Sequence, residues 1–193
     1  ADGPEIQDAI LRAFAGRINV AQSFQLLKEI REQYPEIPIG LLMYANLVHA
    51  AGIDQFYQRC KEAGVDSVLI ADIPLREYPH FHQSALKYKI DPIFICPPDA
   101  RDETIKSIAQ YGSGYTYLVS RAGVTGIDKG LNFDLSRNIE RLQAVNAPPI
   151  VQGFGIATPE QARYFLDSGV QGVLSGSAVT RTTRENSGNR EEM

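Results

Sequence analysis

The chain has 193 residues, of which 44% are hydrophobic and 22% charged, an ordinary globular composition with enough length for one sizeable core. Its formal net charge of -4 gives no electrostatic reason to expect nucleic acid or an anionic membrane as a partner. No apolar run approaches the ~18 residues that suggest a membrane-spanning helix. Cys60 and Cys96 are too few and too far apart for a disulfide framework or a zinc site, which favours buried thiols in a reducing, cytoplasmic setting.

Two amphipathic helices are predicted at the start of the chain. An apolar stripe at helical spacing covers residues 6–14, and a second helix is expected over residues 19–34. Pro4 suits the first turn of the first helix, because proline there lacks only a backbone N–H that has no helical partner. Asp2, just before it, is either a helix-end residue or part of a site.

Six short apolar runs follow, and each is predicted to be a strand. They are Ile37–Tyr44, Ser67–Asp72, Pro92–Cys96, Tyr115–Ser120, Pro149–Gly153 and Gly172–Ser175. The runs are mostly continuous rather than alternating, as expected for parallel strands buried on both faces. Amphipathic segments of helical length, such as residues 53–63 and 162–169, separate them. The order therefore predicts alternating strands and helices around a parallel sheet.

An internal echo supports a repeated strand–helix unit. The segments EAGVDSVLIAD (62–72) and DSGVQGVLSGS (167–177) share a glycine, a valine and a Val-Leu pair at equal spacing. Gly64 and Gly169 would each end a helix in the left-handed conformation. Such a repeat fits either a β/α barrel or an open doubly wound sheet. We expect one domain over residues 1–179 and a polar, disordered tail over residues 180–193, which has no apolar stripe.

Glycine-rich turns follow the last two predicted strands. QGFGIATPEQ (152–161) places Gly153 and Gly155 before a helix start, with a capping box from Thr158 to Gln161. SGSA (175–178) repeats a glycine beside a hydroxyl. Ligands of parallel β/α folds bind at the carboxyl ends of strands, so the two turns form either a phosphate site or plain tight connections.

Other strand ends carry fewer signals. SRAGVTGIDKG (120–130) is either a lid loop or a long connection. Asp72 ends the second strand and could cap or brace a loop. Tyr44 and Tyr117 are either core aromatics or pocket residues. The sequence shows no Ser/His/Asp set and no metal-ligand spacing.

A series of motifs occurs in the order and spacing of a known enzyme family. They are ADGPEIQDAILRAFAG, IPIGLLMYANLV, GVDSVLIADIP, PIFICPP, GYTYLVSRAGVTG, PIVQGFGIATPEQ and GVLSGSAV. Over about residues 1–179 the chain resembles the tryptophan synthase α subunit. The resemblance implies a (β/α)8 TIM barrel that cleaves indole-3-glycerol phosphate to indole and glyceraldehyde 3-phosphate. It implies a retro-aldol carbon–carbon lyase with no cofactor or metal of its own, and a pyridoxal-phosphate-containing β subunit as partner in an α2β2 heterotetramer.

The resemblance also implies roles for single residues. Asp2 matches the catalytic aspartate that accepts the indole N–H. The phosphate-binding positions are matched by Gly126, Gly153, Phe154, Gly155, Gly176 and Ser177. The indole pocket is matched by Leu42, Tyr117 and Phe154. Thr125 matches a position in the lid loop.

The sequence departs from the family pattern at both ends. The family has two further strands before ADGP, and the second ends in the glutamate that serves as general acid/base, which no residue here matches. Six strand runs are present where a closed barrel has eight, about six of the eight strand–helix units. The family also continues GSA into an apolar-faced helix, unlike residues 180–193. We therefore expect a fragment of an α subunit, inactive or poorly stable alone.

Two other interpretations remain open. Another phosphate-binding β/α barrel, such as a phosphosugar isomerase, would need its own acid/base pair, for example a lysine in a strand, and no predicted strand contains lysine. A non-catalytic α-like chain that only docks on a β subunit would need neither the glutamate nor turnover.

Overall fold

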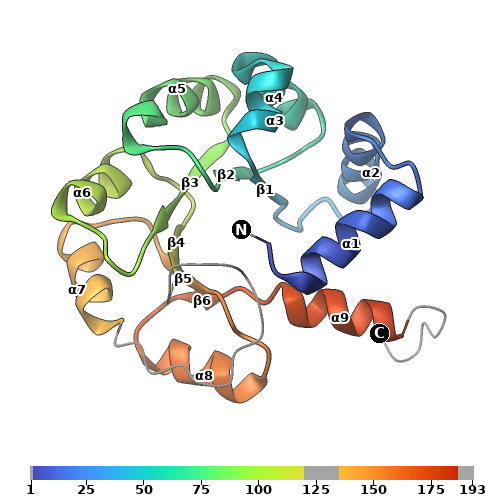
Figure 1. Cartoon of the computed structure of the whole chain (residues 1–193). Coiled ribbons are helices and arrows are strands. Elements are labelled where there is room, and N and C mark those ends of the chain that lie inside the picture. Colours follow the sequence, from blue (N-terminus) through green and yellow to red (C-terminus); the bar gives the residue numbers. More distant parts are fainter. Residues whose placement is uncertain (1, 120–134, 187–193) are drawn as a thin grey trace.

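The computed structural model of the protein describes residues 2–119 and 135–186, and within them all six expected strands lie in one parallel sheet (Figure 1). The strands are β1 (Gly40–Met43), β2 (Ser67–Ile70), β3 (Asp91–Cys96), β4 (Thr116–Val119), β5 (Ile150–Gly153) and β6 (Gly172–Val173). The helices are α1 (Pro4–Ala15), α2 (Val20–Gln33), α3 (Ala45–Ala51), α4 (Ile53–Glu62), α5 (Tyr78–Tyr88), α6 (Asp102–Tyr111), α7 (Ser136–Ala144), α8 (Pro159–Asp167) and α9 (Ser177–Glu185), with a short 3₁₀ turn η1 (Leu75–Glu77).

The strand order decides between the two folds that the sequence left open. The order is β1-β2-β3-β4-β5-β6, and each strand pairs in parallel with the next one along the chain. A doubly wound sheet reverses its strand order at a switch point, and this sheet does not. The helices lie around the outside of the central strands (Figure 1). The expected incomplete TIM barrel is therefore confirmed, and the sheet of the described residues is open between β1 and β6.

Local sequence signals explain where several elements begin and end. Asn19 caps α2 and forms a capping box with Gln22. The predicted capping box from Thr158 to Gln161 is confirmed at the start of α8. Gly64 and Gly169 have φ of 73° and 94°, in the left-handed region that L side chains disfavour. The two helices therefore end where the repeated segment predicted.

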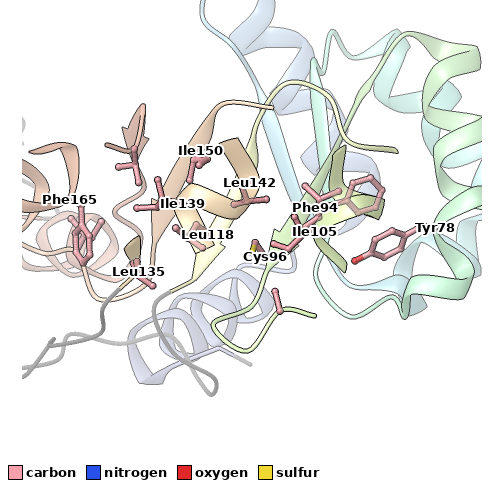
Figure 2. Close-up of a cluster of buried hydrophobic side chains, with 14 residues drawn as sticks. Tyr78, Phe94, Cys96, Ile105, Leu118, Leu135, Ile139, Leu142, Ile150 and Phe165 are labelled. Atoms are coloured by element: carbon pink, nitrogen blue, oxygen red, sulfur yellow. The ribbon is translucent and has the colours of Figure 1, made fainter. Parts of the chain in front are cut away.

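The largest core cluster packs strands β3, β4 and β5 against α6, α7 and α8. Figure 2 shows Leu118 and Ile150 from the sheet near Leu142 of α7, with Phe165 of α8 at the edge of the cluster. At one end of the cluster the Tyr78 ring stacks on Phe94 with centroids 4.1 Å apart. A second cluster lies under α2, α4 and α5, and a smaller one faces the inside of the curved sheet. Each strand is therefore covered on the helix side, which fixes which residues face inward.

The polar segment after β6 departs from the expectation of a disordered tail. Residues 180–185 continue α9, so the expected tail boundary is wrong for that stretch. Arg184 forms an ion pair with Asp8 of α1, with Nη1 3.2 Å from Oδ2, and α9 lies beside α1 (Figure 1). The stabilising contact of this stretch comes from the neighbouring helix α1. The sequence of residues 180–185 alone therefore could not predict it. Residues 187–193 lie outside the described residues.

The described part of the chain holds no helix that is both long and apolar enough to cross a membrane. Cys60 and Cys96 are both free and buried, as the sequence predicted. Burial raises the pKa of each thiol from 9.0 to about 12. Both cysteines therefore act as small apolar core residues.

Candidate active site

A cavity of about 370 Å³ opens on the inner side of the sheet, mainly where strands end. Strand residues Leu42, Leu69 and Tyr117 form part of its wall. The turns after β5 and β6 form another part, with Phe154, Gly155, Ile156, Leu174, Ser175, Gly176, Ser177 and Ala178. Asp2 reaches it from the segment before α1. Residues from both ends of the described chain thus meet in one pocket.

The two glycine-rich turns are held together on one side of this pocket. The Ser175 hydroxyl after β6 donates a hydrogen bond to the Ile156 carbonyl after β5, over 2.8 Å. Gly176 is the N-cap of α9, whose first residue is Ser177. The free N–H groups and dipole of a helix N-terminus favour an anion at this position. The wall therefore combines a helix start with two turns and suits a phosphate group.

The turn after β5 has an unusual backbone. Both Phe154 and Gly155 have φ of 78°, and a left-handed conformation at a phenylalanine is costly. Strain of this kind persists where the surrounding structure fixes the chain. The turn brings Phe154 and Gly155 to the pocket.

Part of the pocket wall is apolar. Tyr117 is buried beside Leu69, Phe154 and other members of the inward-facing cluster. Burial raises the pKa of Tyr117 to about 12, so its ring stays uncharged at neutral pH. A side chain at Gly153 would overlap this ring, which is why glycine suits that position. The space suits a flat aromatic group rather than a charged one.

Asp2 is tied to the sheet by a tyrosine from the end of β1. The Tyr44 hydroxyl donates a hydrogen bond to Asp2 Oδ2 over 2.9 Å. Burial, followed by this hydrogen bond, raises the pKa of Tyr44, so the hydroxyl keeps its proton. Asp72, two residues after the end of β2, accepts the Ala45 N–H over 2.7 Å and braces the turn that carries Tyr44. The bracing role expected for Asp72 is thus observed.

Most of the predicted site residues lie together. The pocket is lined by Asp2, Leu42, Tyr117, Phe154, Gly155, Gly176 and Ser177. Gly153 sits against Tyr117, and the pocket lining does not include it. Gly126 and Thr125 lie outside the described residues. Sequence reasoning missed Leu69, Tyr115, Ile156 and Leu174, because apolar strand and turn residues look the same whether they face helices or a pocket.

The titratable residues of the described chain do not gather into a metal-binding group of three or more His, Cys, Asp or Glu side chains. The polar groups at the pocket are instead one carboxylate, hydroxyls and backbone N–H groups. Such a set can bind a phosphate through N–H donors and orient an aromatic N–H toward a carboxylate.

Comparison with known proteins points to one family. A sequence profile described as "Tryptophan synthase alpha chain" matches residues 1–193. The tryptophan synthase alpha chain of Pectobacterium atrosepticum is 56% identical over 186 residues, which are 96% of this chain and 69% of that protein. The alpha chain of Citrobacter koseri is 52% identical over 193 residues, which are 100% of this chain and 72% of that protein.

Solved structures agree with the sequence relatives. A structure of the tryptophan synthase α2β2 complex from Pyrococcus furiosus superposes with a TM-score of 0.84 at 28% identity, covering 100% of this chain and 76% of that one. Another P. furiosus complex superposes with a TM-score of 0.83 at 29% identity, covering 96% and 74%.

Proposed function

The chain belongs to the tryptophan synthase alpha chain family, and from this premise we propose that the pocket between Asp2 and the two glycine-rich turns binds indole-3-glycerol phosphate. The alpha chain is a carbon–carbon lyase of tryptophan biosynthesis, and it cleaves this substrate to indole and glyceraldehyde 3-phosphate. The observation that carries the proposal is the single cavity that joins a carboxylate, an apolar wall and a helix N-terminus.

The phosphate end of the substrate belongs at the two turns. Gly155, Gly176 and Ser177 supply backbone N–H groups there, and α9 begins at Ser177. Gly153 and Phe154 begin the first turn and are phosphate-binding positions by the resemblance; the left-handed backbone at Phe154 and Gly155 sets the course of the turn. The resemblance alone adds two residues to the proposal. Gly126 is a phosphate-binding position, and Thr125 is a position in the lid loop.

The indole end belongs against Leu42, Tyr117 and Phe154, with its N–H toward Asp2. When the ring carbon that bears the glycerol chain is protonated, positive charge spreads to the ring nitrogen. A carboxylate that accepts the N–H stabilises this charge. The bond to the glycerol carbon then breaks, its electron pair returns to the ring, and the adjacent hydroxyl loses a proton to become the aldehyde. Tyr44 holds Asp2 in place for this step.

The partner of the chain is a tryptophan synthase β subunit, as in the α2β2 complex from P. furiosus. In this family the pyridoxal phosphate belongs to the β subunit, and the alpha chain has no cofactor of its own. The proposal includes a cytoplasmic location, which the two buried, unpaired thiols support.

Substrate binding and indole release test the proposed function in the 193-residue chain. We expect saturable binding of indole-3-glycerol phosphate, with competition by both indole and glycerol 3-phosphate. Asp2→Asn should lower the rate of indole release about 10²-fold relative to wild type, because the N–H of the charged ring loses its carboxylate.

Asp8→Asn is the matched control. Asp8 forms an exposed ion pair with Arg184, so this substitution should leave indole release unchanged. Absence of substrate binding, or equal effects of the two substitutions, would contradict the proposed site. Capture by the β subunit without any indole release would favour the non-catalytic docking chain instead.

A further inference from the structure

Gln161, in the first turn of α8, holds more of the backbone than a helix cap requires. In a capping box the third helical residue accepts the N–H of the N-cap residue, and Gln161 Oε1 accepts the Thr158 N–H over 3.1 Å. The same Oε1 also accepts the Ala157 N–H, over 2.8 Å. Ala157 lies before the helix, in the turn that follows β5. The shorter of the two hydrogen bonds therefore fixes the turn rather than the helix.

The peptide between Ile156 and Ala157 is held from its other side as well. Its carbonyl, which belongs to Ile156, accepts a hydrogen bond from the Ser175 hydroxyl over 2.8 Å. The carbonyl and the N–H of a planar trans peptide point in opposite directions, and the described residues contain no cis peptide bond. Ser175 and Gln161 therefore hold one peptide from opposite sides.

This peptide is one of two fixed ends of the turn after β5. At the other end, Gly153 pairs with Val119 of β4 in the sheet. Between the two ends, Phe154 and Gly155 both have φ of 78°, a conformation that is costly for a phenylalanine. Strained residues persist where the surrounding structure fixes the chain. The two hydrogen bonds to the peptide are therefore part of what holds this turn in its strained conformation.

The turn lines the candidate site, whereas Gln161 does not. The pocket is lined by Phe154, Gly155 and Ile156 from this turn and by Ser175 from the turn after β6. The lining does not include Gln161. Because Gln161 is also uncharged, its effect on a ligand in the pocket passes through the backbone that it holds.

We propose that Gln161 is a positioning residue for the phosphate site: it fixes the Ile156–Ala157 peptide, and this peptide sets the position of the turn after β5 relative to the start of α9. Ser175, which directly precedes the N-cap of α9, links the same peptide to that helix start. The inference rests on the proposed function, because it takes these two turns as the phosphate-binding wall.

The experiment compares Gln161→Met with wild type in the 193-residue chain. Methionine has a similar length and lacks the amide oxygen. We expect the Kd for inorganic phosphate, measured by NMR titration, to rise about fivefold, the equivalent of one lost hydrogen bond. The Kd for indole should not change. The thermal midpoint of unfolding should fall by about 2–4 °C, because α8 loses its capping box.

Gln22→Met is the matched control. Gln22 has the same position in the capping box of α2, where its Oε1 accepts the Asn19 N–H over 3.0 Å. The pocket lining does not include it. This variant should lower the thermal midpoint by a similar amount and leave phosphate binding unchanged. Equal increases of the phosphate Kd in the two variants would show a general loss of stability and overturn the role of Gln161.

A second test asks whether Gln161 and Ser175 act through one peptide. Ser175→Ala should also raise the phosphate Kd, and the double variant should lose no more affinity than the weaker-binding single variant. Effects that multiply would contradict the shared peptide. If Gln161→Met binds phosphate as wild type does, the role of Gln161 is wrong while the site stands. If wild type binds no phosphate, the proposed phosphate site fails, and the role of Gln161 fails with it.

Discussion

Gly153, which lies behind the pocket wall, has no room for a side chain. A Cβ atom added to it would overlap ring atoms of Tyr117, which is itself packed against the inward-facing cluster. Neither the ring nor the strand can move far, because interiors are close-packed. Glycine at this position therefore lets β4 and β5 bring an aromatic wall next to the phosphate-binding turn.

Gly153→Ala is expected to destabilise the protein by about 1–3 kcal/mol, the usual cost of forcing extra atoms into a packed core. Urea unfolding followed by circular dichroism measures this change. The affinity for indole should fall as well, because Tyr117 lines the pocket that the substitution would distort.

Gly176→Ala provides the comparison at the second glycine turn. No atom lies within 4 Å of its added Cβ, and its φ of -110° suits alanine. We expect the free energy of unfolding to change by no more than about 0.5 kcal/mol. Equal losses in the two variants would show that the Tyr117 contact is not the cause.

Among single residues, the sequence predicted which ones line the pocket better than it predicted the contacts that hold them in place. Gly155, Gly176 and Ser177 could be found because each directly follows a predicted strand. The Tyr44–Asp2 hydrogen bond could not, since it joins residues 42 positions apart in the sequence. Tyr44 accordingly stayed undecided between core and pocket.

Among the elements, α2 is tied to the sheet by one arginine near its end. The guanidinium of Arg31 donates two hydrogen bonds to the Gly64 carbonyl, from Nε over 3.0 Å and from Nη2 over 2.9 Å. Its Nη2 also forms an ion pair with Asp66, whose Oδ2 accepts the Ile39 N–H over 2.7 Å. Arg31 thus joins the end of α2, the α4–β2 turn and the start of β1.

Arg31→Met is expected to lower the free energy of unfolding by about 1–2 kcal/mol, since several charge-assisted hydrogen bonds to a mostly covered guanidinium are lost. Lys87→Met is the control for removing a surface cation. The Lys87–Asp54 pair is exposed, so its loss should leave stability nearly unchanged. Urea titration of the two variants separates the cases, and a loss as large for Lys87→Met would argue against the α2 contact.

The elements themselves were largely predictable because their signals are local. Continuous apolar runs gave six strands within a few residues of their bounds, and the capping box at Thr158 marked α8. The short α3 was not predicted, since seven residues between a strand and Gly52 leave little periodicity to detect. The continuation of α9 to Glu185 was missed, because its contacts come from α1 rather than from its own sequence.

The molecule as a whole buries several groups that must stay protonated. Burial raises the pKa of the Cys60 and Cys96 thiols and of Tyr117 to about 12, and it raises the pKa of Tyr57 further. In the unfolded chain, thiols ionise near pH 9 and phenols near pH 10. Above these values the unfolded state binds fewer protons than the folded state, so the free energy of unfolding falls as pH rises.

We expect full stability below about pH 8 and a steady loss from about pH 9 to 12, by up to about 1.4 kcal/mol per pH unit for each group. Urea midpoints measured at intervals across this range test the slope. Cys60→Ala should lower stability at every pH but make the slope shallower, because one titrating group is removed. A flat profile in wild type would mean that these groups ionise without unfolding.

The strand order has a consequence for how the chain is made. Within the described residues, each strand from β1 to β5 pairs with the next one in sequence, as Gly40 does with Ser67 and Val151 with Gly172. None of these six strands has to insert between two that are already paired. The sheet can therefore grow from β1 toward β6 while the ribosome is still adding residues, each new unit docking on an edge that already exists.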